Sequence, residues 1–197
     1  MMKQPVLPIG ATPLDPDEMA GLRLMHITTH GELNRWEQEN ISEAMDWLDK
    51  RKNKSEILTE EFVKKVHEKM FYKVWTWAGT FRRSDKNIGV DWIRIGVDLH
   101  QLLDDVNYWI EYKTYPEDEI AVFFHHRLVK IHPFPNGNGR HSRLMTDILL
   151  TNVLRQKSFT WGNGDLTFTG DVRNRYINAL IMADKNDYVS LMEFVRS

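Results

Sequence analysis

The sequence has no cysteine among its 197 residues, no excess of basic side chains and no long apolar run. Disulfides and thiolate metal sites are therefore excluded, which is compatible with a reducing cytoplasm. With a formal net charge of -2, bulk electrostatics does not indicate nucleic acid as the main partner. No stretch of about 18 apolar residues exists, and the opening residues lack the apolar core of a signal peptide. We expect a soluble, cytoplasmic protein with no membrane partner.

The length and the hydrophobic content, 42% of residues, suffice for one domain with a sizeable core. Four of the seven prolines fall within residues 1–17, which predicts an extended leader there. No internal repeat or low-complexity linker marks a second domain. We therefore expect one domain over residues 18–197.

Apolar residues recur at helical spacing along most of the chain. Thr59 is a suitable N-cap for one of the helices. The pattern predicts a mainly helical, all-α fold. The expected helices lie within residues 32–52, 60–71, 98–112, 116–131, 138–157, 171–181 and 187–195.

Residues 84–97, which we call the flap segment, are the one strand-like stretch of consequence. Apolar residues alternate on both sides of a turn near residues 90–92, as in a short β-hairpin. An isolated hairpin is marginal in water, so we expect it to lie on the helical body with one edge exposed. Such an edge can bind another chain by β-augmentation; a hairpin without a docking role is the alternative. The candidate docking residues are Ile88, Gly89, Val90, Asp91, Trp92 and Ile93.

The chemically densest stretch is residues 131–143, which read I-H-P-F-P-N-G-N-G-R-H-S-R. Gly137 and Gly139 lack a Cβ, so the backbone can take positive φ and turn successive N–H groups toward an anion. Helical spacing begins directly afterwards, which places this nest at a helix N-terminus, where the macrodipole also favours negative charge. The stretch therefore predicts an anion site.

Two arginines and a histidine accompany the glycines. Arg140 and Arg143 are three residues apart, on one face of the first helical turn. A guanidinium can hold a phosphate bidentately, so the pair suits a di- or triphosphate. His132 has an unperturbed pKa near neutrality, which suits a general base acting on a hydroxyl. A lone G-N-G-R is usually a turn, but the added His and Arg favour phosphate binding.

This stretch resembles the signature of the Fic family: His, any, Phe, any, Asp or Glu, Gly, Asn, Gly, Arg, any, any, Arg. Ala78–Arg82 resembles the family's Ala-Gly-x-aromatic-Arg segment, which leads to a β-hairpin. The resemblance covers roughly residues 60–196, and the whole chain is similar to the mobile mystery protein B subgroup. The matching signature positions are His132, Phe134, Gly137, Asn138, Gly139, Arg140 and Arg143.

The resemblance implies a Fic-type helical bundle with a small β-hairpin flap. It implies a protein adenylyltransferase, which moves AMP from ATP to a Ser, Thr or Tyr hydroxyl of a target protein docked on the flap. His132 would be the catalytic base. The nucleotide phosphates would be bound by Asn136, Gly137, Asn138, Gly139, Arg140 and Arg143.

Asn136 departs from the signature, because the family has at this position an acidic residue that binds a magnesium ion. A neutral amide offers only a carbonyl oxygen to a hard cation, so Mg²⁺ should be held weakly. Three readings stay open: slower adenylylation, transfer of another phosphate-containing group, or a nucleotide-binding, toxin–antitoxin-like regulatory module with low turnover. The last would act with a regulatory partner protein.

An inhibitory helix in this family often presents a glutamate to the second signature arginine, here Arg143. Its pattern is Ser or Thr, three residues, Glu, then Gly or Asn. Glu39 and Asn40 match the ending, but Arg35 stands where Ser or Thr is expected. Thr28 and Glu32 have the right spacing, but Leu33 follows them. Glu37 is a third candidate by its facing. The alternative is that these are solvated or capping glutamates on an amphipathic helix.

Two further features are more typical of a core than of a site. His125 and His126 point about 100° apart on a helix and cannot share one metal ion, so we predict polar contacts in the core. Trp75 and Trp77 are predicted as core aromatics.

Overall fold

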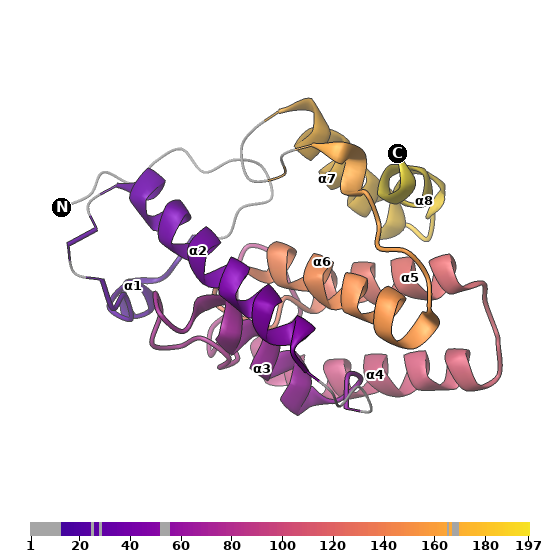
Figure 1. Ribbon diagram of the computed structural model, residues 1–197, viewed down its shortest axis with the longest axis horizontal. Helices are drawn as coiled ribbons and strands as arrows, with labels where there is room; N and C mark the ends of the chain where they lie inside the picture. Colours follow the sequence, from indigo (N-terminus) through magenta and orange to yellow (C-terminus); the bar gives the residue numbers. More distant parts are fainter. Residues whose placement is uncertain (1–12, 25, 28, 52–55, 165, 167–169) are drawn as a thin grey trace.

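The computed structural model describes residues 13–24, 26–27, 29–51, 56–164, 166 and 170–197. The described residues form helices joined by turns, which confirms the all-α prediction (Figure 1). None of the described helices has both the length and the apolar character that crossing a membrane requires. The elements are α1 (Pro16–Met19), α2 (His30–Asp49), α3 (Glu60–Phe71), η1 (Trp92–Arg94), α4 (Ile95–Glu111), α5 (Glu117–Ile131), α6 (Asn138–Ile148), η2 (Leu149–Leu154), η3 (Trp161–Asn163), α7 (Asp171–Ala183) and α8 (Val189–Arg196).

Helices α3, α4, α5 and α6 pack on one another and form the centre of the molecule. Helix α2 lies along the outside of α3, while α7 and α8 stand together over α5 (Figure 1). The buried apolar residues form two clusters. One lies among α2 to α6, and the other joins the outer face of α5 to α7 and α8.

Helix α3 forms as predicted and is fastened to α2. Thr59 is its N-cap and accepts a hydrogen bond from the Phe62 N–H at 3.2 Å. At the other end, the Asn40 side chain of α2 donates to the Lys69 carbonyl and accepts from the Lys73 N–H, both at 3.0 Å. The predicted apolar face is wholly buried: Phe62, Val63, Val66, Met70 and Phe71.

Helix α5 is buried along most of its length and ends at Ile131, as predicted. The next residue, His132, leaves the helix in the left-handed conformation, with φ 52° and ψ 59°. His125 and His126 both contact tyrosine hydroxyls, of Tyr176 at 2.8 Å and of Tyr188 at 3.0 Å, which confirms the predicted core polar contacts.

The predicted β-hairpin in the flap segment was wrong. Residues 84–91 form turns and bends, η1 follows, and α4 begins at Ile95. Residues on one face of a strand should share an environment, yet Ile95 is 1% exposed whereas Ile93 and Val97 are 69% and 66% exposed. That alternation is the start of α4. Within the described residues, the β-pairing consists of one isolated bridge between Leu22 and Trp75.

Side chains within the flap segment explain why no ladder forms. The Asp91 carboxylate accepts from the Ile93 N–H at 3.1 Å, and the Asp85 carboxylate accepts from the Trp92 N–H at 2.9 Å. Short polar side chains that bond to nearby backbone groups compete with a strand in this way.

Element boundaries differ from expectation at two more places. The helix expected to reach about residue 157 passes from α6 into the π-helical turn η2 and stops at Arg155, which is left-handed with φ 59°. The leader prediction for residues 1–12 lies outside the described residues, but α1 already begins at Pro16, capped by Asp15. The domain limits at 1–17 and 18–197 stay a prediction.

Candidate active site

The loop between α5 and α6 is closed by one side chain. Asn138, 2% exposed, donates from Nδ2 to the Phe134 carbonyl at 2.7 Å and accepts at Oδ1 from the Phe134 N–H at 2.9 Å. These two hydrogen bonds satisfy both the N–H and the carbonyl of Phe134. It brings the N-terminus of α6 next to the segment that carries His132. Because both ends of its side-chain amide are engaged in this way, Asn138 contributes its backbone N–H as a donor at the N-terminus of α6.

The two signature glycines do different things. Gly137 is left-handed, with φ 79°, and a Cβ there would lie 2.6 Å from the Phe71 ring. Both facts require glycine. Gly139 lies in the first turn of α6, so the expected positive φ was wrong there. A Cβ on Gly139 would lie 3.7 Å from Nη1 of Arg143, at ordinary contact distance. Its bare backbone leaves room beside that guanidinium.

The N-terminus of α6 is an anion site by its backbone geometry. Its first intrahelical bond runs from the His141 N–H to the Gly137 carbonyl at 2.9 Å. The N–H groups of residues 138–140 therefore have no intrahelical acceptor, and the N-cap residue, Gly137, has no side chain with which to cap them. Unpaired donors and the helix dipole together favour a negative charge here.

His67 supports the same loop from below, and sequence reasoning missed it. Its Nδ1 accepts from the Gly79 N–H at 3.0 Å, so the neutral ring carries its proton on Nε2 and donates to the Asn136 carbonyl at 3.0 Å. The ring also stacks on Phe134 at 3.7 Å. Burial holds the pKa of His67 well below its usual value. No local pattern around His67 signals this role, because both partners come from other segments.

Arg140 is held by α2. Its Nη1 donates to Oε2 of Glu37 at 2.7 Å, and its Cζ lies 5.0 Å from the centre of the Phe71 ring. Glu37, 4% exposed, accepts from Trp75 Nε1 through its other oxygen, also at 2.7 Å. The resemblance implied a contact with the second signature arginine, Arg143. The partner is the first arginine, so that expectation was wrong.

Arg143 lies against α7. Its Cζ is 5.7 Å from the centre of the Tyr176 ring. Burial raises the pKa of Tyr176, while the charge of Arg143 and a hydrogen bond from it act in the opposite direction. The two signature arginines thus lie beside the N-terminus of α6, Arg140 in contact with α2 and Arg143 in contact with α7. Glu39 lies exposed on α2, and its described contacts include neither arginine.

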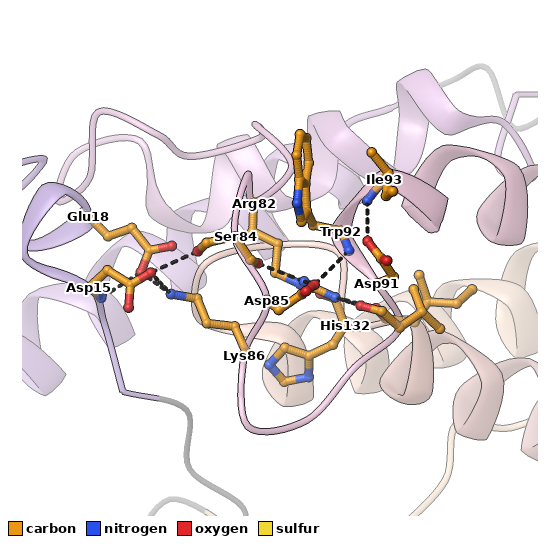
Figure 2. Close-up of polar contacts among 12 residues, drawn as sticks. Asp15, Glu18, Arg82, Ser84, Asp85, Lys86, Asp91, Trp92, Ile93 and His132 are labelled. Carbon is orange, nitrogen blue, oxygen red and sulfur yellow. Dashed lines mark hydrogen bonds and ion pairs between the residues drawn. The ribbon is translucent and has the colours of Figure 1, made fainter.

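His132 is buried and neutral at pH 7. Burial lowers its pKa to about 4, the charges of Arg82 and Lys86 act in the same direction, and a hydrogen bond with the Val129 backbone opposes them. A Cβ on Gly89 would lie 2.8 Å from the His132 Cβ, so the flap segment passes directly beside it. Figure 2 shows the His132 ring below Ser84 and Asp85, within the curve of the loop that carries them.

The flap presents side chains to solvent rather than a strand edge. Ile93 is 69% exposed, Trp92 42% and Ile88 37%. Gly89 and Asp91 are also exposed, whereas Val90 is half-buried and its carbonyl accepts from Arg82. A partner would therefore meet apolar side chains first.

Asn136 is a poor match for a magnesium ion. Its Oδ1 accepts from the Gly137 N–H at 2.6 Å, so the amide oxygen is turned to the backbone. Within the described residues, no group of three or more His, Asp and Glu side chains could hold a metal ion. The hard, oxygen-seeking Mg²⁺ would find at most a partly used neutral oxygen here.

Comparison with known proteins relates the segment that carries this site to one family. Residues 57–150 match the profile of the Fic/DOC family. A protein adenylyltransferase Fic of Aedes aegypti is 27% identical over 147 residues, which cover 73% of this chain and 28% of that protein. The segment that carries the site is therefore similar to the Fic/DOC family. It spans about a quarter of the length of the curated relatives it matches.

Solved structures show the same fold. The N-terminal Fic domain of Bep8 from Bartonella sp. 1-1C has a TM-score of 0.68 and 16% identity, with 90% of each chain covered. BepC of Bartonella tribocorum, solved with bound AMPPNP, has a TM-score of 0.67 and 19% identity, with 99% of this chain and 96% of that chain covered. Similarity to the mobile mystery protein B subgroup stays a prediction.

Proposed function

We propose that this chain transfers AMP from ATP to a hydroxyl of a target protein. One observation carries the proposal: a neutral His132 immediately precedes a loop that ends in a glycine-led helix N-terminus flanked by Arg140 and Arg143. The relatives named as protein adenylyltransferases and the AMPPNP-bound BepC support it.

The backbone would hold the nucleotide. N–H groups of residues 138–140 would bind phosphate oxygens, and the two guanidinium groups would neutralise the β- and γ-phosphates. Preorganised donors aimed at charge that develops in the transition state supply most of the rate enhancement in phosphoryl-type transfer. Asn138 and His67 contribute indirectly, because they fix the loop that carries these donors.

His132 would take the proton of the attacking hydroxyl. The hydroxyl oxygen then attacks the α-phosphorus, an ester to AMP forms, and pyrophosphate leaves with the electrons of the broken P–O bond. A neutral imidazole is the form that accepts a proton, and burial keeps His132 neutral. Bound polyphosphate would raise its pKa toward neutrality, since a nearby negative charge favours the imidazolium.

Magnesium would reach the site on the nucleotide phosphates, where it would supply neutralising charge. The protein would contribute only the Asn136 amide oxygen, weakly.

Target docking and regulation follow from the surroundings of the site. The exposed flap residues Trp92 and Ile93 would contact the target protein. Glu37 would be inhibitory, because it occupies the Arg140 guanidinium that a phosphate needs. Glu39 has no such contact among the described residues. The expected cytoplasmic location accords with the absence of cysteine but stays a prediction.

A second candidate is a nucleotide-binding regulatory module with little turnover, acting with a partner protein. It is favoured by Asn136, whose amide replaces the family's carboxylate and is already engaged by Gly137. Transfer of another phosphate-containing group is a variant of the first proposal.

The test is incubation of the protein and host lysate with ATP labelled at either the α- or the γ-phosphorus. AMP transfer predicts protein labelling from the α-label alone, and its loss in His132→Ala. His100→Ala is the matched control, because His100 is exposed on α4. Label from the γ-phosphorus would indicate a different transferred group. ATP binding with no labelling would favour the regulatory module.

A further inference from the structure

Arg82, a buried side chain outside the signature, donates four side-chain hydrogen bonds to backbone carbonyls. It is 2% exposed. Its Nε donates to the His132 carbonyl at 2.7 Å and its Nη1 to the Ser84 carbonyl at 2.8 Å. Its Nη2 donates to the carbonyls of Val90 and, at 3.4 Å, Ile131. Burial lowers the pKa of Arg82, and Asp85 partly compensates, yet a guanidinium stays charged at neutral pH.

One group of these bonds fixes the backbone at His132. Arg82 also donates through its own N–H to the Pro133 carbonyl at 2.9 Å. Three consecutive carbonyls, of residues 131–133, are therefore held by a single residue. They flank the left-handed turn at His132, a conformation that non-glycine residues adopt only when the surroundings hold it. The direction of the His132 side chain depends on that turn.

The other bonds fix the flap. Ser84 and Val90 lie on either side of Gly89, which passes next to the His132 Cβ. A second clamp is formed by Lys86, whose side chain is 1% exposed and pairs with Asp15 at 2.7 Å and Glu18 at 2.6 Å. Figure 2 shows the Lys86 ammonium between these two carboxylates. The loop over His132 is thus tied down at both ends.

We propose that Arg82 is a positioning residue for the reaction: its planar fork sets both the backbone turn that aims His132 and the loop that covers it. A guanidinium is suited to this, because five donors in one plane can reach carbonyls from two segments at once. A lysine offers a single ammonium on a flexible stem and cannot span them. The inference rests on the proposed role of His132 as the base.

The test compares Arg82→Lys and Arg82→Gln with the wild type. Arg83→Gln is the matched control, since Arg83 is the exposed neighbour. Displacing a catalytic group by about 1 Å costs on the order of 100-fold, so we expect kcat to fall about that much in both Arg82 variants. The KM for ATP should change little, because the nucleotide is held by α6. Arg83→Gln should behave as wild type.

The pKa of His132, followed by NMR of its ring protons, separates geometry from charge. It should rise in Arg82→Gln, which removes a positive charge, and stay low in Arg82→Lys, which keeps one. Wild-type kcat in Arg82→Lys would overturn the proposal. So would a loss of ATP affinity as large as the loss of kcat. If circular dichroism and thermal unfolding show that neither variant folds, Arg82 serves the whole fold and the proposal is wrong.

The failure of the proposed function would be recognised separately. A wild-type protein that transfers no label refutes the transferase assignment. The ring-proton measurements on the same variants would still show whether Arg82 sets the surroundings of His132. No change in the His132 resonances or pKa in Arg82→Gln would then contradict the positioning role.

Discussion

The signature segment, residues 131–143, and the flap segment, residues 84–97, lie side by side but are held in different ways. In the signature segment the closing bonds are local: Asn138 reaches back four residues to Phe134, and Asn136 accepts from Gly137. In the flap segment they come from far along the chain. Arg82 bonds to a carbonyl 50 residues away, and Lys86 to Asp15, 71 residues away. The signature loop is therefore closed by local bonds and supported by His67 and Arg82 from distant segments, whereas the flap above it is held by distant partners.

Lowering the pH should produce the largest difference between the two regions, as a loss of stability. The signature side contains three buried histidines, and burial lowers the pKa of each: His67 well below 6.5, His132 and His141 to about 4. The flap is instead held by the ion pair of Lys86 with Asp15. Hydrogen bonds from Lys86 and Ser84 lower the pKa of Asp15 from 3.8. The two regions should therefore respond in different pH windows.

The sign of the effect follows from linkage. A histidine that is neutral when folded and titrates near 6.5 when unfolded contributes stability that is complete above pH 6.5 and is lost as the pH falls toward 4. The free energy of unfolding should fall by up to about 1.4 kcal/mol per pH unit for each such histidine. Urea titrations at pH 7.5, 5.5 and 4.5 measure it. A flat profile from pH 7.5 to 4.5 would contradict the buried-histidine account.

Substitutions of the two signature glycines should distinguish two roles of glycine: adopting a left-handed backbone conformation and leaving space for a ligand. Gly137→Ala places a Cβ 2.6 Å from the Phe71 ring on a residue with φ 79°. We therefore expect the variant to lose roughly 1–3 kcal/mol of stability and also to lose ATP binding. Gly139→Ala meets only ordinary contacts and should keep its stability but bind ATP more weakly. Thermal unfolding and calorimetric titration measure the two effects.

Gly31→Ala is the control for these variants, since nothing lies within 4 Å of its Cβ position. Equal stability of the Gly137 and Gly139 variants would show that the left-handed turn is not required.

On the flap, Ile93→Ser should impair target modification without touching the nucleotide site. Burying its 69% exposed side chain against a target would contribute about 1–2 kcal/mol, so labelling of the target should fall about tenfold. ATP affinity should not change. Val189→Ser, at a 65% exposed aliphatic residue on α8, is the matched control. Equal labelling by both variants would remove Ile93 from the docking surface.

Freeing Arg140 should have a smaller, activating effect. Glu37→Gln removes the partly buried ion pair to Arg140, worth about 1 kcal/mol, and should strengthen ATP binding about fivefold. Glu39→Gln, on the exposed face of the same helix, should change nothing. Calorimetric titration with ATP measures both. Weaker binding in the Glu37 variant would show that the ion pair supports the site instead of blocking it.

The smallest effect is expected at Asn136. Asn136→Asp restores the carboxylate of the family signature and should raise turnover at limiting Mg²⁺ by no more than about threefold, because a screened charge near 4 Å contributes under 1 kcal/mol. Asn107→Asp, exposed on α4, adds the same charge elsewhere. Identical magnesium dependence in the two variants would mean that residue 136 does not contact the metal.

What could be read from the sequence follows the same division. Helices α2 to α8, the Thr59 cap and the glycine-led N-terminus of α6 depend on neighbours in the chain, and all were predicted. The environments of His67 and Arg140 were not, because their partners lie 69 and 103 residues away. The flap was misread because alternation of apolar residues at 93–97 also fits the first turn of a helix.

The most direct test is an NMR titration of the ¹⁵N-labelled protein with ATP. The account predicts that the largest amide shifts fall on Gly137, Asn138, Gly139 and Arg140, with the ring protons of His132 shifting as its pKa rises. Largest shifts elsewhere in the chain, with these amides and His132 unmoved at saturation, would contradict the claim that the N-terminus of α6 binds the nucleotide beside the base.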